Sequence, residues 1–216
     1  RVTADVVASY IHGGGRIGVL VAGNGASDDA AKEALTNIAM QIAAMNPQYI
    51  SRDEISADEL AKMKEITIDS ALNDPFSLPK PVLSKLIEKA VAGVWSAEDV
   101  AIYEEKKSNM NFLPNFLSKE AKAQLAEIAC ADKEEISGNK IFSGLVEGRI
   151  SKQMKEICLL DQVYVKAEDG KQTVAAYLKS VNPALKIAKF VRFEVGEGME
   201  KKNEDFAAEV AKQMNV

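Results

Sequence analysis

The sequence predicts an α+β fold, a three-stranded antiparallel sheet in the order β-β-α(n)-β with a helical protrusion or coiled-coil insertion. Three observations carry this prediction. Residues 6–22 alternate in polarity on both sides of a glycine run, which is typical of a hairpin. Apolar residues then recur at helical spacing until about residue 181, and residues 186–195 alternate again as a third strand. The simplest packing places the first helix on one face of the sheet.

The opening hairpin turns at three consecutive glycines, Gly13 to Gly15. Glycine adopts positive φ at little cost, and tight turns between two strands often demand it. The turn places His12, the only histidine of the chain, and Arg16 at the hairpin tip. Two interpretations of His12 stay open: a polar turn residue without a role, or an exposed residue that contacts a partner from a rigid sheet.

The first helix is expected to begin after an N-cap at Ser27, with Asp28 and Asp29 in its first turn. Its apolar face is formed by residues at helical spacing, and it ends at Asn46-Pro47. These apolar residues are Ala31, Leu35, Ile38, Ile42 and Met45.

A helical segment follows, and Ser56 with Glu59 forms a capping box at its start. Residues 75–135 are expected to be all-helical and to form an insertion, with further caps at Ser96 and Ser118. The loop 109–116 carries apolar side chains that form an exposed patch or, as we favour, pack within the insertion. These side chains are Met110, Phe112, Leu113 and Phe116.

A longer helix is predicted over residues 141–157, although Gly144 and Gly148 each weaken it by roughly 1 kcal/mol relative to alanine. Close approach of another helix and a local bend explain these glycines equally well. Residues 159–165 are expected to be extended.

In the third strand, the alternate residues from Ile187 to Val195 are expected to face the core, and Phe190 and Arg192 to lie on the wetter side. A final amphipathic helix is predicted after Asn203.

We expect residues 1–55 and 159–200 to form a sheet-containing core, 56–158 the helical protrusion and 201–216 a C-terminal helical module. Because the sequence begins at Arg1, we take it as a fragment or processed form of a longer protein.

Composition is that of an ordinary globular protein, with 47% hydrophobic and 27% charged residues. The net charge of −5 argues against wholesale binding of nucleic acid, which needs a basic field. No apolar run approaches the ~20 residues that a membrane span requires. Two separated cysteines, Cys130 and Cys158, indicate reduced thiols and a cytoplasmic location.

Catalytic motifs fail on inspection. The segment from His12 to Gly15 resembles a lipase oxyanion loop, but no G-x-S-x-G elbow or second histidine accompanies it. No P-loop lysine follows the glycine pairs, and His12 with the two cysteines lacks zinc-ligand spacing. The sequence therefore predicts a noncatalytic interaction protein without a cofactor or metal.

Several ordered motifs resemble the bacterial elongation factor Ts family. Ser9–Val21 is similar to its S-Y-x-H-x-x-x-R-I-G-V-L-V segment, and Ile38–Pro47 to its I-A-M-x-x-A-x-x-x-P helix end. Leu159–Val165 resembles L-L-x-Q-x-F-V. Arg192–Gly198 and Asp205–Val210 resemble the last strand and the C-terminal helix of the family.

The resemblance implies a protein that binds elongation factor Tu in its GDP form and promotes GDP release by distorting the phosphate and magnesium site. It also implies which residues contact Tu: the hairpin tip, the segment at 164–165 and the C-terminal helix. These residues are His12, Gly13, Arg16, Tyr164, Val165, Phe206 and Val210. The family's T-D-F-V motif, which inserts a phenylalanine beside the magnesium, is absent from this sequence, so we expect binding with little exchange. The alternative is an oligomerisation or interaction module, with a homodimer through the helical region.

Overall fold

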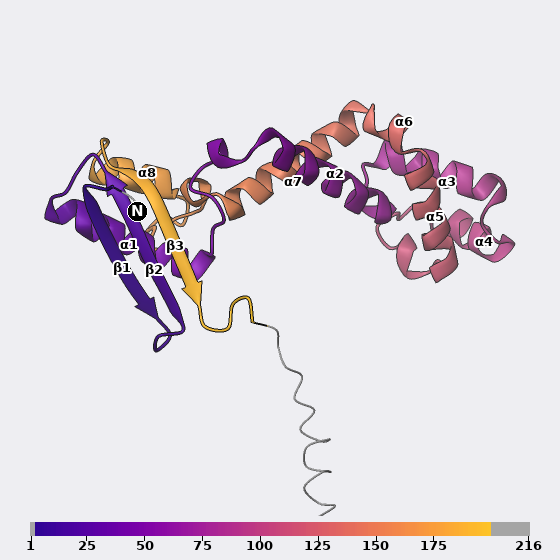
Figure 1. Cartoon of the computed structure of the whole chain (residues 1–216). Coiled ribbons are helices and arrows are strands. Elements are labelled where there is room, and N and C mark those ends of the chain that lie inside the picture. Colours follow the sequence, from indigo (N-terminus) through magenta and orange to yellow (C-terminus); the bar gives the residue numbers. More distant parts are fainter. Residues whose placement is uncertain (1–2, 200–216) are drawn as a thin grey trace, which may run out of the picture. The chain divides into compact units, whose positions relative to one another are not determined.

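The structure, a computed structural model, describes residues 3–199. It divides into two compact units: one comprises the chain up to Asn46 and from Tyr164 onward, and the other runs from Pro47 to Val163. All three strands belong to the first unit, whereas the second consists of helices and turns (Figure 1). The predicted α+β class with a three-stranded antiparallel sheet is confirmed.

The sheet has the order β1-β2-β3, with β1 (Val6–His12), β2 (Ile17–Asn24) and β3 (Lys186–Glu194) paired antiparallel. Helix α1 (Asp29–Met45) covers one face of β1 and β2, as predicted (Figure 1). The buried residues between them alternate along the strands and recur at helical spacing on α1. They are Val6, Ala8, Val19, Val21, Ala31, Ala34, Leu35, Ile38 and Ile42.

The predicted N-cap of α1 is off by one residue. Asp28, not Ser27, has the extended backbone of a cap, with φ −72° and ψ 174°. Its carboxylate accepts a hydrogen bond from the backbone N–H of Ala31 at 3.0 Å. A carboxylate satisfies a free N–H at this position and also complements the helix dipole, which a hydroxyl does not.

The predicted faces of β3 are wrong over most of its length, because the register shifts between Ala22 and Gly23. Ile187 pairs with Gly23 on the face toward α1, but after the irregularity Phe190 pairs with Val21 and Arg192 with Val19. Val191 and Phe193 therefore lie on the opposite face, where Phe193 is 63% exposed. One additional residue in a strand exchanges its two faces, and simple alternation along the sequence cannot show this.

Helix α8 (Val174–Val181) leads into β3, and the turn between them packs against the loop after β2. Gly25 in that loop has φ +95°, and a Cβ there would lie 1.9 Å from the carbonyl oxygen of Ala184. The N–H of Gly25 also donates to the carboxylate of Asp5 at 2.8 Å. Both the backbone angle and the close approach require glycine at this position.

The second unit contains α2 (Ala57–Asn73), α3 (Lys80–Gly93), α4 (Ala97–Lys106), α5 (Lys119–Ala131), α6 (Lys133–Ser137) and α7 (Lys140–Ile157). Short 3-10 turns lie at Arg52–Glu54, Pro75–Ser77, Leu113–Asn115 and Leu159–Asp161. The capping box of Ser56 and Glu59 is confirmed, as are the caps at Ser96 and Ser118. A core of its own fills this unit, including Leu86, Ile87, Leu113, Leu125 and Phe142.

Three expectations for this unit are corrected in whole or in part. Residues 159–161 form a 3-10 turn and are not extended. A Cβ on Gly144 or Gly148 would meet nothing within 4 Å, so no described helix approaches them closely. In the 109–116 loop Leu113 is fully buried, as we favoured, but Phe112 and Phe116 remain 57% and 51% exposed. The ammonium of Lys106 lies 5.0 Å from the centre of the Phe116 ring.

Asp99 joins the start of α4 to the start of α5. Its carboxylate accepts hydrogen bonds from the Ser118 N–H at 2.9 Å, the Ser118 hydroxyl at 2.8 Å and the Ser96 hydroxyl at 2.9 Å. Burial raises the pKa of Asp99, but the hydrogen bonds from Ser118 and Ser96 outweigh it and hold the pKa below its usual value. The ionised carboxylate therefore stabilises both helix starts together.

We expect Gly25→Ala to lower the free energy of unfolding of the sheet-containing unit by about 3 kcal/mol, the sum of strained φ and a backbone clash. Gly14→Ala is the matched control, because its φ is +66° but nothing lies within 4 Å of its Cβ. That variant should lose only about 1 kcal/mol. Urea denaturation followed by circular dichroism measures both, and equal losses would contradict the packing described at Ala184.

Asp99→Asn should lower the free energy of unfolding of the helical unit by about 1–2 kcal/mol near neutral pH. Because the folded pKa of Asp99 is depressed, its stabilisation is present above the unfolded pKa, about 3.9, and is lost as the pH falls through the folded pKa. Wild type and variant should therefore converge in acid. Denaturation followed by fluorescence of the single tryptophan, the buried Trp95, measures this.

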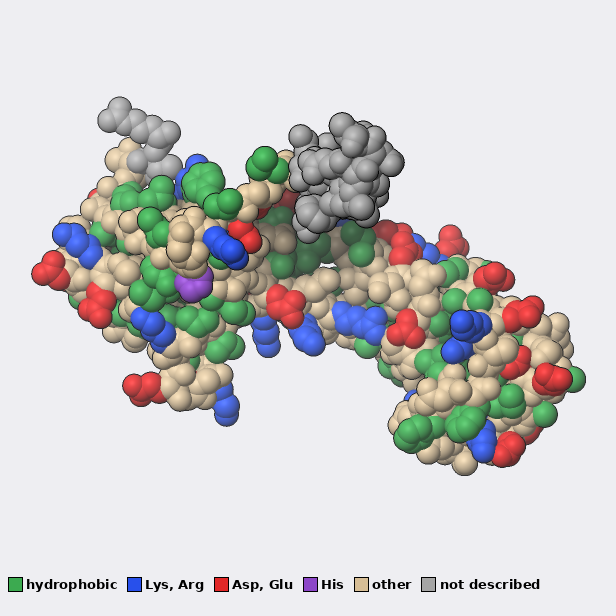
Figure 2. Space-filling view, turned by 90° about the horizontal axis from the view of Figure 1, so that it is seen from below, with side chains coloured by type: hydrophobic (Ala, Val, Ile, Leu, Met, Phe, Trp, Pro, Cys, Tyr) green, Lys and Arg blue, Asp and Glu red, His purple; other side chains and the backbone are tan. Residues whose placement is uncertain are grey.

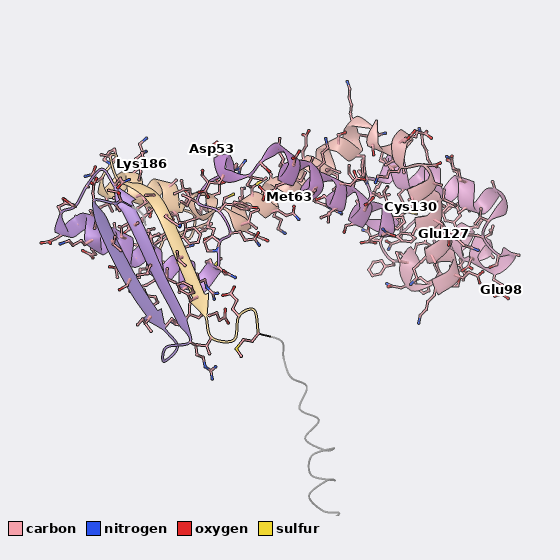
Figure 3. The ribbon with its side chains drawn as sticks, viewed as in Figure 1. Asp53, Met63, Glu98, Glu127, Cys130 and Lys186 are labelled. Carbon is pink, nitrogen blue, oxygen red and sulfur yellow. The ribbon has the colours of Figure 1, made fainter. Side chains whose placement is uncertain are left out.

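Glu98→Gln is the control for this experiment. Glu98 is the exposed neighbour of Asp99 and projects away from the helices (Figure 3). Its amide substitution should leave stability unchanged, and a loss equal to that of Asp99→Asn would refute a specific role for the buried carboxylate.

Candidate partner-binding surface

The hairpin tip extends beyond the part of the sheet that α1 covers. Gly13, Gly14 and Gly15 have φ values of +62°, +66° and +93°, which only glycine adopts readily. All three are exposed, so the turn presents bare backbone. The prediction that glycines shape this turn is confirmed, and the flanking side chains, His12 and Arg16, are its only large polar groups.

His12 and Arg16 are both exposed at this tip. Figure 2 shows the histidine, in purple, at the surface among hydrophobic side chains. The hydroxyl of Tyr10 lies 3.1 Å from His12 Nδ1. The carbonyl oxygen of Arg16 accepts the N–H of Val195 at 2.8 Å, which ties the tip to the end of β3.

Tyr164 and Val165, also predicted to contact a partner, differ from each other in exposure. Tyr164 is buried and stacks on Tyr177, with ring centres 4.1 Å apart and planes 12° apart. Burial, followed by the hydroxyl of Tyr177, raises the pKa of Tyr164 far above its usual value. Val165 is 47% exposed, and it alone of the two offers side-chain surface to a partner.

The segment around Val165 is anchored to α1 by polar contacts. The buried amide of Gln41 accepts the N–H of Val165 at 2.8 Å. Asn37 donates to the hydroxyl of Tyr177 at 2.9 Å and accepts from the ammonium of Lys166 at 2.7 Å. The sequence interpretation missed these polar anchors, although Asn37 and Gln41 at helical spacing on α1 were a signal for them.

The sequence interpretation also missed the outer face of the sheet. Val7, Ile11, Leu20 and Phe193 are between 48% and 71% exposed there, and the register places them on the side away from α1. The signal was present in β1 and β2, where both alternating rows are largely apolar. A cluster of exposed apolar side chains is typical of an interaction surface.

Phe206 and Val210, the remaining predicted contacts, lie outside the described residues, as does the helix predicted after Asn203. Between residues 3 and 199 there is no group of three or more His, Cys, Asp or Glu residues that could hold a metal ion. None of the helices in that range is long and apolar enough to cross a bilayer.

Comparison with known proteins bears on what this surface is for. A family model described as Elongation factor TS matches residues 1–197, which include the hairpin tip, Tyr164, Val165 and β3. The chain belongs to the elongation factor Ts family. Members of this family serve in the elongation phase of protein biosynthesis, which accords with the resemblance of the ordered motifs.

Individual elongation factor Ts proteins are similar over almost the entire chain. One from Clostridioides difficile is 37% identical over 216 residues, covering 99% of this chain and 51% of its own length. One from Desulforamulus reducens is 35% identical, covering 100% and 75%. One from Alkaliphilus metalliredigens is 37% identical, covering 97% and 72%. The chain thus spans about half of the first relative and about three quarters of the other two.

The raised pKa of Tyr164 predicts alkaline sensitivity of the sheet-containing unit. Its stabilisation is complete below the pKa of an unfolded tyrosine, about 10, and is lost as the pH rises further, because only the unfolded chain ionises there. Tyr164→Phe should therefore lose less stability than wild type between neutral and alkaline pH. Denaturation followed by circular dichroism, with phenolate absorbance as a second signal, measures this. The same alkaline loss in both proteins would show that Tyr164 is not buried in solution.

Proposed function

We propose that this chain binds elongation factor Tu in its GDP form through the hairpin tip and the surface at Val165. The observation that carries the proposal is the tip: an exposed imidazole and guanidinium beside three side-chain-free residues, at the end of a packed sheet. Loops held by a rigid scaffold are favourable sites for recognition. Family membership supports Tu as the partner.

Binding of this kind promotes nucleotide release by linkage. If the chain binds the nucleotide-free form of Tu more tightly than the GDP form, partner and nucleotide weaken each other by the same factor. No bond to the protein forms or breaks, so the chain acts as an exchange factor and not as an enzyme. Because no Thr-Asp-Phe-Val occurs in these 216 residues, we propose that this chain binds Tu but accelerates GDP release only slightly.

Titration of the chain into Tu carrying a fluorescent GDP tests both parts. Saturable binding with a small increase in the rate of GDP release is the expected result. His12→Ala should weaken binding about tenfold, as for a residue central to an interface. Glu127→Ala, a substitution on α5 in the other unit, is the control and should bind as wild type. Absence of binding by wild type at high micromolar concentration would refute the proposal.

The exposed outer face of the sheet favours a second candidate, self-association of two copies through this face. The notebook of sequence motifs had instead indicated the helical region, where Gly144 and Gly148 face open space. Sedimentation of the chain alone, across the concentrations used for the titration, separates the two candidates. A monomer throughout removes self-association.

A further inference from the structure

The side chains on the inner face of β1 become progressively more exposed toward the tip. Val6 and Ala8 are buried beneath α1, Tyr10 is half-buried and His12 is exposed. Alternate residues of a strand share a face, so the Tyr10 ring lies between the core and the imidazole. Tyr10 therefore has one side fixed by the packed sheet and its hydroxyl directed along the row to His12.

The two side chains are in direct polar contact. Tyr10 Oη lies 3.1 Å from His12 Nδ1, and the ring centres are 5.9 Å apart with planes at 36°. A neutral imidazole has one nitrogen that accepts and one that donates. A phenol hydroxyl is a better donor than acceptor, and the unprotonated imidazole nitrogen is the stronger base of the two groups. The hydroxyl therefore donates to Nδ1, which leaves the hydrogen on Nε2.

Nε2 is the ring nitrogen farther from the backbone, and it faces an open surface. Within residues 3–199 the structure shows no hydrogen bond from Nε2 to any protein atom. Gly13 to Gly15 contribute no side chain that could cover it, and Cβ atoms at Gly14 and Gly15 would meet nothing within 4 Å. The ring thus presents one N–H donor outward.

We propose that Tyr10 is a positioning residue for partner recognition: it holds the His12 ring with Nε2–H directed outward, toward an acceptor oxygen of the partner. The inference rests on the proposed function and specifies the chemistry at its central contact. The group recognised on Tu is a carbonyl or carboxylate oxygen, not a donor. Tyr10 itself acts only through His12.

The tautomer can be measured without the partner. Because the chain has a single histidine, a ¹⁵N-labelled sample gives one pair of imidazole nitrogen signals. At a pH where His12 is neutral, wild type should show the hydrogen on Nε2 almost exclusively, and Tyr10→Phe should show an increased Nδ1–H population. A wild-type spectrum dominated by Nδ1–H, or spectra identical in the two proteins, would overturn the inference.

A double-mutant cycle on Tu·GDP affinity tests whether Tyr10 acts through the imidazole. Tyr10→Phe should weaken binding about threefold to tenfold, the usual range for one hydrogen bond. In the His12→Ala background the same change should have no further effect, because its target is gone. Tyr103→Phe, the same substitution in the helical unit, is the control and should leave affinity unchanged. Additive losses at Tyr10 and His12 would show that Tyr10 contacts Tu directly and would overturn the inference.

Two amide substitutions of His12 test the outward donor. The amide nitrogen of His12→Gln can reach the position of Nε2, whereas that of His12→Asn reaches only the position of Nδ1. The Gln variant should therefore retain more affinity than the Asn variant. Equal losses, or the reverse order, would exclude an Nε2–H contact.

These results separate the two proposals. If wild type binds Tu·GDP and Tyr10→Phe binds equally well, the role of Tyr10 is refuted while the proposed function stands. If wild type does not bind, the proposed function is refuted and this inference falls with it.

Discussion

The packing of α1 on the inner face of the sheet is the contact on which the rest of the sheet-containing unit depends. Leu35 is fully buried, and its methyl groups approach the Cα of Gly23 so closely that a Cβ there would lie 3.1 Å from one of them. That approach occurs at the point where the register with β3 shifts. The same helix buries Gln41, which accepts the N–H of Val165. One helix therefore fixes both the sheet and the segment at 164–166.

The helical unit meets a different constraint, because it is inserted between α1 and α8 and must provide its own core. Its buried residues come from α2 to α7 and form one cluster. Each of its short helices leaves free N–H groups at its start, which need partners. Ser96 and Ser118 cap two of these starts, and Asp99 binds both hydroxyls, so capping and tertiary packing are linked through one carboxylate.

Much of the fold could be predicted because local chemistry decides it. Alternation predicted all three strands, and the serine caps at 56, 96 and 118 predicted three helix starts. The faces of β3 could not be predicted, because the shift at Ala22 and Gly23 depends on a close approach between distant residues. The burial of Tyr164 was missed for the same reason, since its stacking partner Tyr177 lies in a separate helix. The tip was predictable because its glycines are a local signal.

The position of the tip follows from the lengths of the elements that pack together. The inner row of β1 begins beneath α1 at Val6 and continues past the helix to Tyr10 and His12, so its last residues lose apolar cover. Residues at such a boundary are partly buried and partly wet, which suits a side chain with an apolar ring and a polar end. Tyrosine at this boundary can pack its ring toward the core and direct its hydroxyl to the exposed imidazole. A buried phenol would lack that reach, and a fully exposed one would be free to rotate away. The order of burial along one strand is thus what makes a hydrogen bond at a solvent-exposed tip directional.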